Sequence, residues 1–65
     1  MIQLTKLNKK QFILNCDLVE TIESTPDTVI TLRNGKIYIV AETPDEIVAL
    51  VSEFRRSLYA DLLGR

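Results

Sequence analysis

The sequence predicts an α+β fold: a five-stranded antiparallel β-meander over residues 1–42, with one C-terminal α-helix over residues 43–63 packed across it. Three observations predict this fold. Short apolar segments fill the first two thirds of the chain, and turn residues such as Asn34-Gly35 separate them. After Thr43-Pro44 the apolar residues recur at helical spacing. The length of 65 residues leaves room for a single domain with one small core.

The first expected hairpin pairs residues 2–7 with residues 10–15 around Asn8-Lys9. Tight two-residue turns favour Asn-Gly, so Lys9 predicts a turn that is either longer or strained. A two-residue turn would put Ile2, Leu4 and Ile13 on one face, and Leu7, Phe12 and Leu14 on the other. Because both faces then carry apolar side chains, this hairpin is not expected to be covered on one side only.

The second expected hairpin is marked by Asn34-Gly35, a strong turn signal between residues 28–33 and residues 36–41. A two-residue loop would pair Ile30 with Ile39 and Leu32 with Ile37 on the core face. The opposite face would then hold Val29, Thr31, Arg33, Lys36, Tyr38 and Val40.

A further strand over residues 19–24 is expected between the two hairpins. A three-residue loop, Thr25-Pro26-Asp27, would set Ile22 opposite Ile30 on the core face.

The helix is expected to begin at a capping box, with Thr43 as N-cap, Pro44 at the first helical position and Glu46 three residues after the cap. It should end near Gly64. One apolar stripe faces the sheet: Ile47, Leu50, Val51, Phe54 and Leu58. The apolar arc is wider than this stripe, because it also includes Val48, Tyr59 and Leu63. A helix of this length spans about 30 Å and strands of this length reach about 17–20 Å, so the last turns should overhang the sheet.

Composition excludes several classes of function. The chain has no His and one Cys, so it lacks the commonest general base and metal ligand, and it cannot form an internal disulfide framework. Glu20 and Glu23 would point to opposite faces of a strand and so cannot act as a catalytic pair. Cys16 lies beside Asp17, which does not favour a reactive thiolate. We therefore expect no enzyme, no catalytic residues, no metal and no cofactor.

The charge pattern gives little support for nucleic acid or membrane partners. The net charge is −1. Lysines cluster at Lys6, Lys9 and Lys10, and Arg55-Arg56 lie on the helix, but no aromatic stacking pair is expected on a basic strand face. Apolar runs are too short to span a bilayer, and the alternating N-terminus lacks a signal-peptide pattern. The expected location is the cytoplasm, without membrane insertion. The alternative to a protein-binding function is that of a small RNA-binding regulator.

Two surfaces are candidates for binding a protein. One is the overhanging helix end, which contains Leu58, Tyr59, Leu62 and Leu63. The other is the second sheet face, which contains Phe12, Leu14, Tyr38 and Val40. Each surface has a structural alternative without a binding role. For the helix end, the helix frays after Arg56; for the sheet face, the sheet curls so that Phe12 and Tyr38 belong to the core. A domain this small is marginal alone, so a partner or a homo-oligomer is expected.

Several segments resemble the small flagellar FlbD/SwrD family of swarming motility proteins. They are LNCDLVETIE from Leu14 to Glu23, TPDTVITL from Thr25 to Leu32, and Asn34-Gly35-Lys36. The opening residues 1–8 and the helix entry from Thr43 to Ile47 fit the same pattern, so the resemblance covers roughly residues 1–56. Two features depart from it: Lys9 stands where the family commonly has Gly, and the tail from residue 57 to residue 65 lies outside the matched region.

The resemblance implies a small cytoplasmic protein that is needed for full motility and has no enzymatic motif. It suggests a flagellar accessory protein that binds components of the motor or its stator units, at the cytoplasmic face of the flagellar motor.

Overall fold

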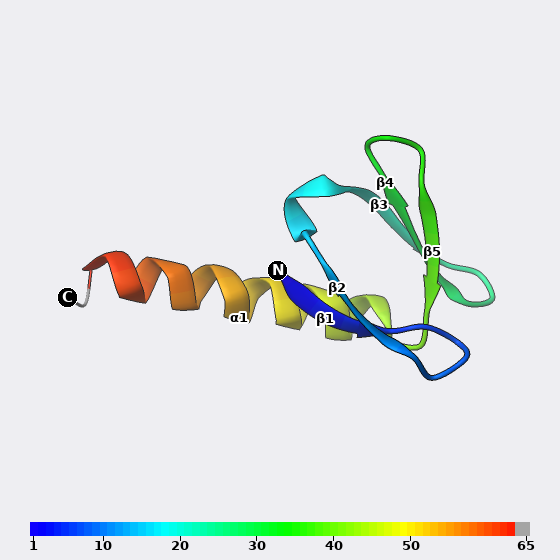
Figure 1. The fold of residues 1–65 in the computed structure, drawn as a ribbon, viewed down its shortest axis with the longest axis horizontal. Helices are drawn as coiled ribbons and strands as arrows, with labels where there is room; N and C mark the ends of the chain where they lie inside the picture. Colours follow the sequence, from blue (N-terminus) through cyan, green and yellow to red (C-terminus); the bar gives the residue numbers. More distant parts are fainter. Residues whose placement is uncertain (64–65) are drawn as a thin grey trace.

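A computed structural model describes residues 1–63 of the chain (Figure 1). The chain forms five strands and then one helix, as the sequence predicts. The elements are β1 (Ile2–Thr5), β2 (Gln11–Leu14), a 3-10 turn η1 (Cys16–Leu18), β3 (Val19–Ser24), β4 (Thr28–Leu32), β5 (Ile37–Val40) and α1 (Pro44–Leu63).

The five strands form two antiparallel sheets, so the prediction of one continuous meander is wrong. β1 pairs with β2, and a separate sheet has the order β3-β4-β5. The break lies at η1, which the sequence reading missed. Asn15 caps this turn, because its side chain accepts a hydrogen bond from Asp17 N. The turn redirects the chain between β2 and β3, so these two strands are not paired within the described residues.

The two sheets meet where β1 and β5 end. A single bridge joins Lys6 to Val40, and Ala41 N donates to Thr5 O at 2.8 Å. Glu42 reinforces this junction, because its carboxylate accepts from Thr5 N at 2.9 Å and from Thr5 Oγ1 at 2.8 Å. The link holds the first hairpin against the end of the second.

Both hairpins have three-residue loops, which corrects the expected two-residue registers. In the first, Lys9 N donates to Lys6 O, and Lys9 has φ of 74°. In the second, Gly35 N donates to Leu32 O, and Gly35 has φ of 86°. A turn followed by a left-handed residue is the usual three-residue hairpin loop. Of the two alternatives stated for the Lys9 turn, longer or strained, the structure shows the longer loop, and Lys9 itself takes a positive φ.

The longer loops shift each register by one residue and exchange the faces of the returning strand. In the first hairpin Leu4 faces Phe12, and Ile13 is exposed. In the second Ile30 faces Tyr38, so Ile37 and Ile39 lie on the outer face and not in the core. The third expected register is confirmed, because Ile22 does face Ile30.

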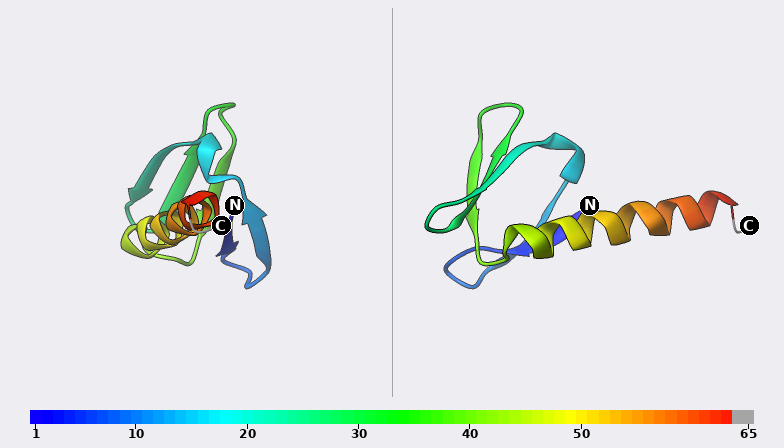
Figure 2. Two further views of the ribbon diagram at one scale, coloured as in Figure 1. Left: turned by 90° about the vertical axis from the view of Figure 1, so that its left-hand side faces the viewer. Right: turned by 180° about the vertical axis from the view of Figure 1, so that it is seen from behind.

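The core lies between the two sheets and the first turns of α1. Its buried members are Ile2, Leu4, Leu14, Cys16, Ile30, Leu32, Val40 and Ile47. The helix packs against β1 on one side and β3 on the other (Figure 2). The capping box is confirmed, since Glu46 N donates to Thr43 Oγ1 and Thr43 N donates to Glu46 Oε1. The first half of the helix is therefore anchored at both its start and its inner face.

Candidate partner-binding surface

The second half of α1 projects from the body of the protein, as the comparison of lengths predicts (Figure 1). Exposed fractions rise toward the end of the helix: 48% at Leu58, 65% at Tyr59 and 81% at Leu62. The helix does not end at Arg56, since it continues to Leu63. The predicted candidates Leu58, Tyr59 and Leu62 thus lie together on an uncovered apolar surface. The side chain of Leu63 and the predicted stop at Gly64 lie outside the described residues.

An open groove between α1 and β3 leads to this overhang. Its volume is about 340 Å³, and its walls are mainly apolar: Cys16, Val19, Ile22, Ile47, Val48, Val51, Ser52 and Arg55. Residues three, four or seven apart share a helix face, so Val48 and Arg55 continue directly into Tyr59 and Leu62. The groove and the overhang form one strip along α1, which we call the helix strip. Sequence reasoning missed the groove, although Val48 in the widened apolar arc was a signal of it.

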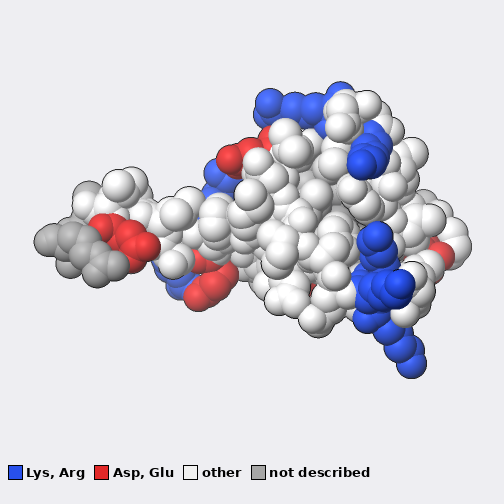
Figure 3. Space-filling model, viewed as in Figure 1, with Lys and Arg blue, Asp and Glu red and all other residues white. Residues whose placement is uncertain are grey.

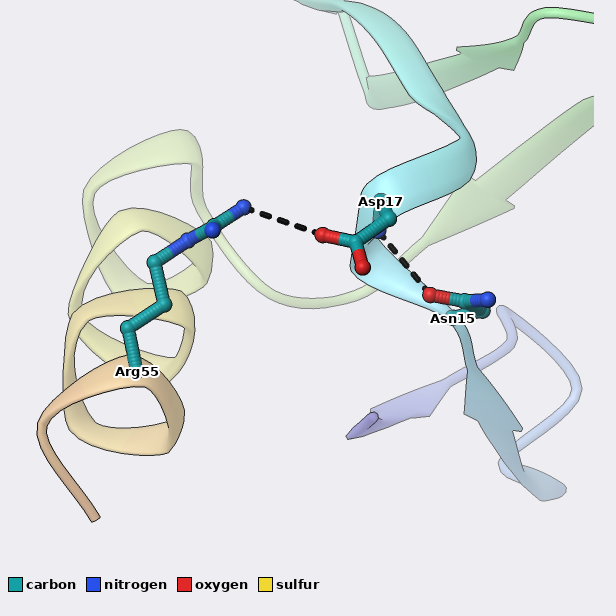
Figure 4. A network of polar contacts seen from close by, with 3 residues as sticks. All are labelled: Asn15, Asp17 and Arg55. Atoms are coloured by element: carbon teal, nitrogen blue, oxygen red, sulfur yellow. Dashed lines mark hydrogen bonds and ion pairs between the residues drawn. The ribbon is translucent and has the colours of Figure 1, made fainter. Parts of the chain in front are cut away.

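A polar contact marks the point where the helix leaves the body (Figure 4). Arg55 reaches across to Asp17 Oδ1 at 3.2 Å, and Asp17 N donates to Asn15 Oδ1 at 3.0 Å. Both charged side chains are well exposed, so the ion pair contributes little stability by itself. Its geometric effect is to join η1 to α1 at the mouth of the groove.

The second predicted surface, which contains Phe12, Leu14, Tyr38 and Val40, is buried or partly buried in the structure. Leu14 and Val40 are buried in the core, while Phe12 and Tyr38 are half-buried and pack against it. Their rings stack with centroids 5.0 Å apart, which joins the two sheets across the seam between them. The alternative in which Phe12 and Tyr38 are core residues is therefore closer to the structure than an open binding face.

This ring pair contradicts the expectation that no aromatic pair stacks beside basic side chains. Lys6 Nζ lies 5.5 Å from the Phe12 ring centroid, and Lys36 Nζ lies 6.0 Å from that of Tyr38. An aromatic stack beside lysines is thus present, contrary to the prediction. In the observed register Tyr38 lies opposite Ile30, and both Tyr38 and Phe12 pack against the core. Lys and Arg side chains gather over the two hairpin ends on this side of the molecule (Figure 3).

One acidic side chain, Glu42, has a shifted pKa. Partial desolvation raises the pKa of the Glu42 carboxyl, but the hydrogen bonds from Thr5 outweigh that effect and leave the pKa below its ordinary value. Glu42 thus acts as a structural anion at the sheet junction. Across residues 1–63 no three His, Cys, Asp or Glu side chains come close enough together to hold a metal ion.

The comparison with protein families decides where the chain belongs. The model of the FlbD family, described as flagellar and swarming motility proteins, matches residues 1–59. The chain belongs to the FlbD family. The resemblance read from the residues is confirmed, and the match extends past residue 56 to include Leu58 and Tyr59. No curated protein and no solved structure matches the chain.

Membership of the FlbD family gives the chain a role in flagellar and swarming motility. In the part of the chain that the structure describes, no helix is both long enough and apolar enough to cross a membrane.

Proposed function

We propose that this FlbD protein is a non-enzymatic flagellar accessory protein that supports motility by binding a motor or stator component through the helix strip. It acts in the cytoplasm, at the cytoplasmic face of the flagellar motor. The observation that carries the proposal is the continuity of the apolar groove with the exposed overhang of α1.

The shape of the helix strip indicates the kind of segment it would bind. A groove with one helical wall and an apolar extension fits an amphipathic helix, which lays its apolar face along the groove. The far wall, formed by Val19 and Ile22 of β3, would contact the same partner helix near the body. Tyr59 is suited to be an anchor, because a large ring with a polar tip is typical of residues that dominate interfaces.

Capture from flagellated cells tests this proposal. A photo-crosslinking residue placed at position 59 should trap a motor or stator protein, and the double variant Tyr59→Asp with Leu62→Asp should no longer co-purify it. Ser57→Asp with Ala60→Asp is the matched control, because it adds the same charge to the same turns on the opposite helix face. The assignment would be refuted if the double variant Tyr59→Asp with Leu62→Asp still co-purified the partner efficiently. It would also be refuted if the crosslinker at position 59 trapped no flagellar protein.

RNA binding remains a second candidate because of the stacked Phe12–Tyr38 pair and the lysines beside it. Aromatic rings in a basic setting are typical of single-stranded nucleic acid sites. Here, however, the two rings already stack on one another, and each has a lysine over it. A base would therefore have to displace an existing contact.

Salt dependence separates the two candidates. RNA held through phosphate contacts should be released between about 50 and 200 mM salt, whereas apolar contact along the helix strip should persist over that range. Tight, salt-sensitive binding of a single-stranded RNA that is lost in Lys6→Ala with Lys36→Ala would favour the RNA candidate.

A further inference from the structure

The first hairpin carries a local positive charge that the net charge of the chain conceals. The first acidic residue in the sequence is Asp17, so the hairpin of β1 and β2 contains three lysines and no acidic side chain of its own. All three lysines lie at the tip: Lys6 and Lys10 close the loop, and Lys9 is within it. In Figure 3 a patch of Lys and Arg side chains covers this end of the hairpin.

The backbone of the tip holds its loop in one conformation. Lys6 N donates to Lys10 O at 2.8 Å, and Lys9 N donates to Lys6 O at 2.9 Å. The Asn8 side chain accepts from Lys10 N at 3.0 Å. Residues 6–10 are all exposed, and neither Lys9 nor Lys10 forms an ion pair within the described residues 1–63. Their ammonium groups are therefore available to an anionic partner.

One apolar side chain stands among these cations. Leu7 is 54% exposed and is neither a core residue nor packed against the core. A single acidic side chain from elsewhere in the chain, Glu42, contacts the hairpin, where its carboxylate accepts from Thr5 N and Thr5 Oγ1. The three lysines outnumber it. The tip thus presents positive charge around an exposed aliphatic group.

This combination fits the surface of an anionic lipid bilayer. Lysines are attracted to the negative surface potential of the cytoplasmic leaflet, and an aliphatic side chain beside them is stabilised in the headgroup region. A projecting loop meets such a soft, flat surface without needing a groove. Single-stranded nucleic acid fits less well, because residues 6–10 contain no aromatic ring on which a base could stack.

The place of the hairpin in the fold leaves the helix strip accessible. The loop between β1 and β2 and the overhang of α1 lie at opposite ends of the molecule (Figures 1 and 2). A chain attached to lipid through this loop keeps the overhang away from the bilayer, where a protein partner can reach it.

We propose that the tip of the first hairpin docks on an anionic lipid bilayer. Lys6, Lys9 and Lys10 lie at the headgroup phosphates, and Leu7 lies between the headgroups. In this arrangement the chain rests on the bilayer surface. Three charges and one leucine give a weak and reversible attachment, because stable anchoring requires stronger signals than these.

Co-sedimentation of the full chain with lipid vesicles tests the charge contribution. The chain should bind vesicles made of phosphatidylcholine and phosphatidylglycerol in equal parts but not phosphatidylcholine alone, and salt should weaken the binding by screening. Lys9→Gln with Lys10→Gln should lower the partition coefficient about 25-fold, since each lysine near such a surface contributes about fivefold. Ser57→Asp with Ala60→Asp is the matched control, because it changes the net charge equally at the far end of the molecule.

A second matched pair tests the apolar contribution. Leu7→Ser should weaken binding about fivefold, because the leucine no longer gains from leaving water. Ile13→Ser should have no effect. Ile13 is 62% exposed on the same hairpin, but it lies three residues before the loop-closing Lys10, about 10 Å from it along the strand. Unchanged circular dichroism shows that each variant is folded.

Three results would overturn the proposal: no binding to the anionic vesicles, equal binding to neutral vesicles, or full binding by the variant Lys9→Gln with Lys10→Gln. Single-stranded RNA that binds the chain while anionic vesicles do not would assign the lysines to nucleic acid instead. These outcomes are independent of the capture experiment, because Tyr59→Asp with Leu62→Asp should bind the vesicles as the unmodified chain does.

Discussion

Two residues show how one backbone position changes a whole strand. Lys9 and Gly35 occupy the same place in the two hairpin loops, and in each loop the preceding Asn side chain accepts from the backbone N–H two residues on, at 3.0 Å. The sequence signal Asn-Gly indicates a turn at this place. It does not distinguish a two-residue loop from a three-residue loop, and that difference exchanges the faces of Ile37, Tyr38, Ile39 and Val40.

Lys9→Gly should stabilise the protein. A left-handed conformation costs a residue with a side chain about 1–2 kcal/mol relative to Gly. Introducing Gly in turn lowers the folding stability by about 0.4–1 kcal/mol, because it increases the conformational freedom of the unfolded chain. A net gain of about 0.5–1 kcal/mol in unfolding free energy is expected from urea denaturation.

Gly35→Ala is the complementary change, and it should cost about 1 kcal/mol for the same reason. The site has no atom within 4 Å of an added Cβ, so the loss would come from the positive φ alone. If Lys9→Gly destabilises the protein while Gly35→Ala is neutral, the loop geometry is not as described.

Glu42 should make stability depend on pH. Its pKa is lowered in the folded state, so its contribution is fully present above the ordinary Glu pKa of about 4.3 and is lost as the pH falls through the lower folded value. Glu42→Gln should reduce the unfolding free energy by about 1 kcal/mol at pH 7, and the difference from the unmodified chain should shrink toward pH 3. A difference that grows on acidification would contradict this role.

At the scale of elements, the two halves of α1 differ in burial. Ile47 is fully buried, whereas Leu58 is 48% exposed. The sequence predicted both the capping box and the overhang, because caps and helix length are local properties. It could not predict the groove beside β3, because that depends on where η1 turns the chain and how the two sheets meet.

Alanine substitution should separate the two halves. Ile47→Ala should cost about 2–4 kcal/mol in unfolding free energy, because it leaves a cavity in the core. Leu58→Ala should change it by no more than about 0.5 kcal/mol, as expected for a surface position. Equal losses at both positions, measured by thermal or urea denaturation, would mean that the overhang packs against the body.

At the scale of the whole molecule, the division into two sheets leaves two uncovered apolar surfaces on opposite parts of the fold. The helix strip was predicted in part, from an apolar arc too wide for one sheet to cover. The apolar outer face of the β3-β4-β5 sheet was predicted only in part: Val29 and Thr31 were placed on it, but the two-residue register assigned Ile37 and Ile39 to the core. Phe12 and Tyr38 were predicted as a partner face, but their stacking across the seam could follow only from the three-dimensional arrangement of the two sheets.

If the helix strip binds the flagellar partner, motility should depend on the exposed half of α1. The direct measurement is the swarming rate of flagellated cells that lack their own copy of the gene and express a variant at the normal protein level. The unmodified chain and the control Ser57→Asp with Ala60→Asp should restore swarming, while Tyr59→Asp with Leu62→Asp should not. Full restoration by the Tyr59→Asp with Leu62→Asp variant would contradict the assignment of partner binding to this surface.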